Sequence, residues 1–150
     1  MAIFISYAKE DAEFAKSLFL ALRSASLDPW MDKPPAPHQA AGLIPGEDWR
    51  ARLESEIRGA DRVIMILSEN SIAKVGYVQR EFRLALDVMG AMPAGARFAL
   101  PLLIDGCEPP DLVVGSIRLS DFQWTSLEDV NLETFIQMVA NDLALQGGGA

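Results

Sequence analysis

The chain has 150 residues, of which 50% are hydrophobic and 23% are charged, and this is enough for one globular domain with a substantial core. Its 13 basic and 21 acidic residues give a net charge of −8, which argues against direct nucleic-acid binding because the phosphate backbone is also negative. No apolar run is long enough to cross a bilayer and no cationic signal-peptide start is present, so we expect no membrane contact and a cytoplasmic location.

The first part of the chain alternates strand-like and helix-like segments. Residues 2–7 (AIFISY) predict a strand, and the apolar positions after Asp11 recur with helical spacing. Residues 27–32 predict a short second strand, in which Pro29 favours an edge position. Residues 33–46 contain four prolines and two glycines, and a loop of this length is typical either of a functional loop or of a stiffened surface excursion.

A helix is predicted to begin after Asp48 and to end at Gly59. Its apolar stripe consists of Trp49, Leu53 and Ile57. We expect Trp49 to lie in the core rather than against a ligand.

The segment that follows predicts a buried central strand and then a helix. Residues 63–67 are five consecutive apolar residues, a pattern typical of a central parallel strand that is covered on both faces. Polar residues 68–71 end this strand, and apolar positions at helical spacing follow over 78–89. Tyr77 and Glu81 are four residues apart, so one helical turn places an aromatic ring beside a carboxylate.

The second half of the chain predicts two more strands and a last helix. The segments are a strand over 97–105, a helical turn over 111–114, a short edge strand over 116–119 and an amphipathic helix over 129–145. The Gly-rich residues 146–150 resemble a flexible tail or the start of a linker, so the folded domain is expected to span residues 1–145.

Alternating strands and helices predict a parallel sheet with helices on both faces. Five strands in a chain of this size favour a flavodoxin-like three-layer sandwich with strand order 2-1-3-4-5. Its switch point lies between strands 1 and 3, and ligands of open α/β sheets bind at such points. We therefore expect Ser6 and Tyr7 to lie beside Ser68 and Glu69, with the long loop after strand 2 near the same rim.

Missing motifs argue against several kinds of enzyme. The chain has no GxGxxG and no GxxxxGK[ST], so the usual signals for a dinucleotide fold or a P-loop are lacking. It has no GxSxG, and its one histidine, His38, lies in the proline-rich loop, which disfavours a serine hydrolase. Strand 3 ends in Leu67 and Ser68 rather than in a phosphoacceptor aspartate. The single cysteine, Cys107, predicts neither a disulfide nor a metal site, and is typical of a reducing compartment.

Glu81 remains as a candidate for chemistry. A lone glutamate on a helix is usually solvated surface, but here Tyr77 could stack on a ligand ring, and Ser68 and Ser71 could donate hydrogen bonds. For both serines, helix capping is an equally open alternative. Departure of neutral nicotinamide from a cationic N-glycoside needs little acid assistance, so one carboxylate beside the developing oxocarbenium ion is sufficient for NAD cleavage.

Four motifs along the chain resemble those of TIR (Toll/interleukin-1 receptor) domains of the bacterial kind. They are FISY followed by Asp11, WMD at 30–32 followed by LIPGEDW at 43–49, the central strand at 63–68 followed by Ser71, and YVQRE at 77–81. The last is similar to W-C-x-x-E, whose glutamate is the catalytic carboxylate of NAD-cleaving members. Tyr77 and Val78 stand where Trp and Cys are usual, and the loop at 33–42 is longer and richer in proline than is typical.

The resemblance implies a TIR-domain NAD+ glycohydrolase that releases nicotinamide and forms ADP-ribose or a cyclic ADP-ribose-type product. Glu81 would be the catalytic residue, NAD+ the substrate, and no cofactor or metal would be required. The implied substrate-binding residues are Ser6, Tyr7, Asp32, Ser68, Ser71 and Tyr77.

The resemblance also implies an effector or signal producer in antiphage immunity, activated by self-association with other TIR domains and fused to or paired with a sensor domain. The alternative is a non-catalytic interaction module of the adaptor or virulence type, which would use residues 33–46 and the helix face around Glu81 for its contacts. The acid retained at position 81 favours the enzyme over this alternative.

Overall fold

A five-stranded parallel sheet forms the centre of the structure, which is a computed structural model. It describes residues 2–73 and 77–148, apart from the side chains of residues 77, 78 and 146–148. Its strands, in spatial order, are β2 (Asp28–Trp30), β1 (Ala2–Ser6), β3 (Arg62–Leu67), β4 (Ala99–Leu103) and β7 (Thr125–Ser126). The helices are α1 (Ala12–Ser24), α2 (Trp49–Gly59), α3 (Glu69–Ala73), α4 (Tyr77–Gly90) and α5 (Leu132–Gly148). The flavodoxin-like fold and its strand order are thereby confirmed.

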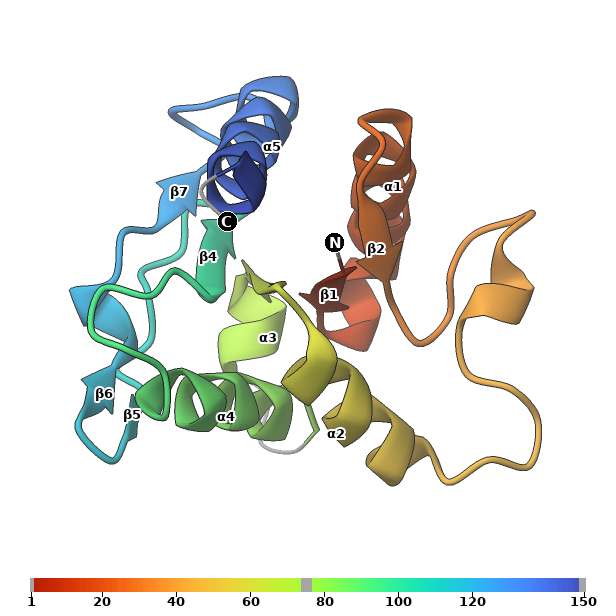
Figure 1. The fold of residues 1–150 in the computed structure, drawn as a ribbon, viewed down its shortest axis with the longest axis horizontal. Coiled ribbons are helices and arrows are strands. Elements are labelled where there is room, and N and C mark those ends of the chain that lie inside the picture. Colours follow the sequence, from red (N-terminus) through yellow and green to blue (C-terminus); the bar gives the residue numbers. More distant parts are fainter. Residues whose placement is uncertain (1, 74–76, 149–150) are drawn as a thin grey trace.

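Helices cover both faces of the sheet, and each face has its own apolar core (Figure 1). The core under α1 and α5 receives Ile3, Ile5, Ile64, Ile66 and Leu102 from the strands. The core under α2 and α4 receives Phe4, Val63, Met65, Leu67 and Leu103. Because successive strand residues point to opposite faces, the uninterrupted apolar run of β3 serves both cores, as the sequence predicts for a central strand.

The start of α2 confirms one prediction and corrects another. Asp48 caps the helix, since its Oδ1 accepts hydrogen bonds from the backbone N–H groups of Arg50 (3.1 Å) and Ala51 (3.3 Å). Leu53 and Ile57 are buried as predicted, but the prediction that Trp49 lies in the core is wrong, because its side chain is 43% exposed. Trp49 is the first residue of α2, and the Arg50 guanidinium lies 5.1 Å from its ring centroid.

The segment between β4 and α5 also differs from the prediction. Residues 111–114 form no helical turn; β5 (Val113–Val114) pairs instead with β6 (Ile117–Arg118) in a separate antiparallel hairpin. Gly115 has φ +61° and opens its two-residue turn, which favours glycine there. The fifth strand of the main sheet is therefore β7, whose two polar residues carry no alternating apolar pattern.

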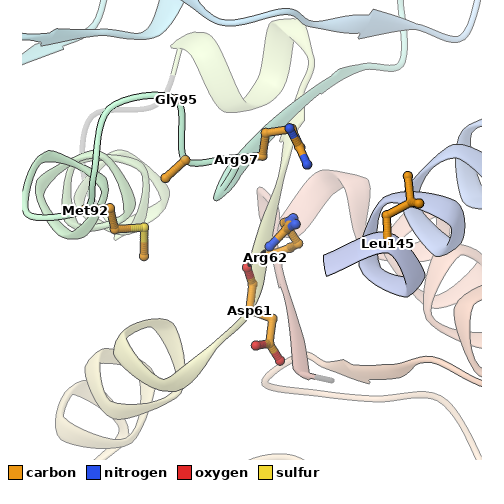
Figure 2. A pocket seen from close by; sticks show the side chains of 7 residues that line it. Asp61, Arg62, Met92, Gly95, Arg97 and Leu145 are labelled. Carbon is orange, nitrogen blue, oxygen red and sulfur yellow. Dashed lines mark hydrogen bonds between the residues drawn. The ribbon is translucent and has the colours of Figure 1, made fainter. Parts of the chain in front are cut away.

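Paired charges hold α5 to the amino ends of β3 and β4. Arg62 is buried, and its Nη2 and Nε donate to Asp142 Oδ2 at 2.8 and 3.2 Å, while Arg97 Nε donates to Asp142 Oδ1 at 2.7 Å. Burial disfavours the charged form of Asp142, but the two arginines, Arg62 first, outweigh it and lower its pKa below the ordinary value. Figure 2 shows both arginines lining a pocket of about 400 Å³ at the amino edge of the sheet.

We expect Asp142→Asn to reduce the free energy of unfolding by about 3 kcal/mol at pH 7, because it removes the charged group that pairs with the buried Arg62. The folded state lowers the pKa of Asp142. The variant's loss of unfolding free energy is therefore complete above about pH 4, the pKa of an aspartate in an unfolded chain, and it becomes smaller as the pH falls through the lower pKa of the folded state. Urea denaturation at pH 7 and pH 3 measures it. Asp111→Asn, which breaks the exposed pair with Arg118, is the control and should cost less than about 1 kcal/mol; equal losses would contradict the prediction.

Candidate functional site

The carboxyl ends of β1 and β2 are joined by a hydrogen bond between side chains. Tyr7 follows β1, and its Oη donates to Asp32 Oδ1, two residues beyond β2, at 2.5 Å. The backbone N–H of Lys33 donates to the same oxygen at 3.0 Å. Burial, the bond to Asp32 and the nearby charges of Asp32 and Glu81 raise the pKa of Tyr7 above its ordinary value. The phenol therefore stays protonated and holds Asp32 in place.

Glu81 brings a second carboxyl group to these strand ends. It lies on α4, which packs against β1, and its side chain is partly buried. Burial and then the negative charge of Asp32 raise the pKa of Glu81 well above its ordinary value, while the Ser6 hydroxyl acts in the opposite direction. The Glu81 carboxyl group is therefore shielded from water and close enough to Asp32 and Ser6 for both to affect its pKa.

One buried polar group of this cluster has no hydrogen-bond partner of normal geometry among the described residues. Ser6 is 0% exposed, and its Oγ has no partner of normal geometry among the described residues, although it is close enough to affect the pKa of Glu81. Both hydrogen bonds to the Asp32 side chain end on Oδ1, so that Oδ2 has none in the described part of the chain. Buried polar groups are nearly always paired, so the buried Ser6 Oγ is a candidate for contact with a ligand.

Glu81 also lines a pocket of about 190 Å³ between α2 and α4. Arg50 and Arg80 line the same pocket from the two helices. The sequence analysis did not single out these arginines, because only the packing of α2 against α4 brings them together.

Ser68 and Ser71 are buried and hydrogen bonded to each other. Ser71 N donates to Ser68 Oγ at 3.1 Å, and Ser68 N donates to Ser71 Oγ at 2.9 Å, the reciprocal pattern of a helix cap. Ser68 Oγ donates to the buried Asp11 at 2.5 Å. This is the geometry of the capping alternative; ligand contact by the two serines stays a prediction.

The remaining site prediction concerns Tyr77, whose side chain lies outside the described residues. Its backbone begins α4, one turn before Glu81. Stacking of Tyr77 on a ligand ring therefore stays a prediction.

Three further observations bear on other kinds of function. No group of three or more His, Cys, Asp or Glu side chains within residues 2–73 and 79–145 is arranged to hold a metal ion. Burial, followed by the effect of Asp105, raises the pKa of the Cys107 thiol to about 12, so this residue is poorly suited to act as a thiolate nucleophile at neutral pH. No helix in the described ranges combines the length and the apolar character needed to cross a membrane.

The loop between β2 and α2 projects beyond the body of the domain but is anchored at its base (Figure 1). Leu43 N donates to the backbone oxygen of Asp32 at 2.9 Å, so the chain returns to the point where it left the sheet. Gly42 makes this return possible, since a Cβ there would lie closer than 3.0 Å to both the Asp32 oxygen and the Pro34 ring. The anchor therefore fixes the backbone that carries Asp32.

We expect Gly42→Ala to reduce the free energy of unfolding by about 1–3 kcal/mol, because the added methyl group collides with backbone that has little room to move. Chemical denaturation measures the loss. Gly59→Ala is the matched control: a Cβ at that position meets nothing within 4 Å, and alanine suits a helix. A loss at Gly42 no greater than at Gly59 would show that the loop adapts.

We expect Glu81→Gln to raise the midpoint of thermal unfolding at pH 7.5 and to change it little at pH 4. The folded state raises the pKa of Glu81 above its ordinary value of 4.5, so at higher pH the unfolded chain loses a proton that the folded state retains, and stability falls. Glutamine removes this penalty. Circular dichroism melts at both pH values provide the measurement, with the exposed Glu133→Gln as control. A lower midpoint for Glu81→Gln at pH 7.5 would contradict the expectation.

Comparison with known proteins identifies the family of the chain. No curated protein matches the chain. A family model described as TIR domain matches residues 3–139, nearly its whole length. The match spans all five strands of the main sheet, the Tyr7–Asp32 bond and Glu81. The chain belongs to the TIR domain family.

Proposed function

We propose that the protein is an NAD+ glycohydrolase in which Glu81 is the catalytic residue. The observation that carries the proposal is the position of the Glu81 carboxyl group, partly buried at the ends of β1 and β2 beside Asp32, Tyr7 and Ser6. A carboxyl group with so perturbed an environment, in a cluster of incompletely paired polar groups, is a strong candidate for a catalytic group. Ser68, Ser71 and Tyr77 complete the proposed substrate-binding residues.

The reaction needs one stabilising negative charge at the sugar. The glycosidic bond breaks with its electron pair passing to the ring nitrogen, so cationic nicotinamide leaves as a neutral molecule and positive charge develops on the ribose. The ionised Glu81 stabilises this oxocarbenium ion. Water then adds to the anomeric carbon and loses a proton, which gives ADP-ribose; attack by a nucleophile of the same molecule gives a cyclic product instead. No cofactor and no metal take part in the proposed reaction.

We assign the activity to a cytoplasmic effector or signal producer of antiphage immunity that works with a fused or partner sensor domain. The bacterial character of its four sequence motifs supports this role. Activation by self-association is supported by apolar side chains near the projecting loop, where Ile44 is 52% and Trp49 43% exposed. Such exposed apolar groups favour contact with another protein.

The same exposed side chains support a second candidate, a non-catalytic TIR interaction module. A docking surface, however, gains nothing from a desolvated carboxyl group held next to a second one, because that arrangement costs stability. Glu81 therefore favours the enzyme.

We expect the purified protein to release nicotinamide from NAD+ slowly in dilute solution and faster when it is clustered at high density on a bead surface. Glu81→Ala and Glu81→Gln should reduce the clustered rate by about 10³-fold, because each removes the charge that stabilises the oxocarbenium ion. Chromatographic measurement of nicotinamide and ADP-ribose follows the reaction, with Glu133→Ala as a matched surface control.

Two outcomes would contradict this proposal. Absence of nicotinamide release by the clustered wild type would favour the interaction module. Equal release by wild type and Glu81→Ala would remove Glu81 from the mechanism.

A further inference from the structure

The pocket of about 190 Å³ between α2 and α4 is lined by an arginine from each helix. Arg50 comes from the first turn of α2, and Arg80 comes from α4, where it directly precedes Glu81. Glu81 lines the same pocket. The two helices contact each other and lie side by side on one face of the sheet (Figure 1). The pocket therefore brings two cationic side chains together with the carboxyl group of the proposed reaction.

Arg50 differs from most other arginines of the chain, because it forms no ion pair with a carboxylate in the described ranges. The arginines that do are Arg52, Arg58, Arg62, Arg97 and Arg118. Helical spacing would offer Glu54 to Arg50, but Glu54 Oε1 accepts instead from Arg58 Nε at 3.1 Å. The Arg50 guanidinium lies 5.1 Å from the Trp49 ring centroid. In a chain of net charge −8, this cation is thus left for an anionic ligand.

The size and lining of the pocket suit one anionic part of a ligand. Pockets that enclose a whole small molecule usually measure about 300–1,000 Å³, so a pocket of about 190 Å³ is a subsite. Guanidinium groups are planar and bind phosphate oxygens through two parallel N–H groups. Glu54 also lines the pocket, but its charge is already compensated by Arg58.

We propose that Arg50 and Arg80 bind the diphosphate of the dinucleotide substrate, so that the pocket between α2 and α4 is its diphosphate subsite. In NAD+ the ribose that carries nicotinamide is joined to the diphosphate through its 5′ carbon. A ribose at Glu81 therefore places the diphosphate close to the arginines that line the same pocket. This inference rests on the proposed function, which names the dinucleotide. It assigns substrate binding to the two arginines and leaves the bond-breaking step to Glu81.

The first test measures binding and needs no cleavage. Radiolabelled ADP-ribose keeps the diphosphate but lacks nicotinamide, and its binding to the bead-clustered protein is measured at about 0.15 M salt, with inorganic pyrophosphate as competitor. The variants are Arg50→Gln, Arg80→Gln and Arg50→Lys. Arg83→Gln on α4 and Arg23→Gln on α1 are the matched controls, because each removes one exposed positive charge that does not line the pocket.

We expect wild type and both controls to bind ADP-ribose equally and to release it when pyrophosphate is added. Arg50→Gln and Arg80→Gln should each weaken binding by about tenfold, because each removes a charged donor to phosphate. Arg50→Lys should lose only about threefold, since it keeps the charge but not the planar fork. Thermal melts show whether each variant is folded; if one glutamine variant is not, the other decides the result.

The second test compares two substrates with the same glycosidic bond. NAD+ carries the diphosphate, whereas nicotinamide riboside carries no phosphate. With NAD+, each glutamine variant should raise KM by about tenfold and change kcat by less than about threefold. With the riboside, kcat/KM should stay within about threefold of wild type, and if wild type does not cleave the riboside, ADP-ribose binding decides the result.

Several results would overturn the inference. They are unchanged ADP-ribose affinity in the folded glutamine variants, equal losses in Arg83→Gln, no displacement by pyrophosphate, and no ADP-ribose binding by wild type. Equal losses with NAD+ and with the riboside would also do so, because they would show a structural role. A protein that cleaves NAD+ but binds ADP-ribose without the two arginines keeps the proposed function and loses this inference. A protein that binds ADP-ribose through both arginines but releases no nicotinamide does the reverse.

Discussion

The hydrogen bond between Tyr7 and Asp32 is the interaction around which the candidate site is organised. It joins the ends of two neighbouring parallel strands, β1 and β2, at 2.5 Å, and it holds a carboxylate at the point where the long loop leaves the sheet. The return of that loop at Leu43 and the close approach at Gly42 keep the backbone of Asp32 fixed. A charge fixed in this way can act on Glu81, which comes from a helix far along the chain.

The helix that carries Glu81 is itself anchored through hydrogen bonds to the first part of the chain. Gln79 Nε2 donates to the backbone oxygen of Ser71 at 2.9 Å, which links α4 to α3. Ser71 and Ser68 bond to each other, and Ser68 bonds to Asp11 just before α1. Because Asp11, Ser68 and Ser71 are all buried, these bonds are shielded from water and tie the start of α4 to β1 and β3.

The charged groups at the two edges of the sheet are arranged in opposite ways. At the amino edge, Asp142 lies between Arg62 and Arg97, so opposite charges compensate each other and the network stabilises the fold. At the carboxyl edge, the negative charge of Asp32 raises the pKa of Glu81, and the buried Ser6 hydroxyl has no hydrogen-bond partner of normal geometry within the described ranges. An arrangement that opposes folding is typical of a site whose missing partner is a ligand. The contrast explains why the proposed chemistry belongs to the carboxyl edge and not to the pocket at the amino edge.

The sequence by itself determined the fold class, the central strand and most of the inward faces of the helices, and it singled out Glu81 as a candidate, because apolar periodicity and short motifs are local properties of the chain. It also placed Ser6 and Tyr7 at the rim, since parallel strands end at the same edge. It could not identify β7 as the fifth strand, because two polar residues carry no pattern. It placed Trp49 in the core, because helical spacing alone does not show whether the first residue of a helix is covered. Only the tertiary structure decided that burial and the charge of Asp32 both raise the pKa of Glu81, because the two residues are distant in sequence and the pKa of a carboxyl group depends on the groups that folding brings around it.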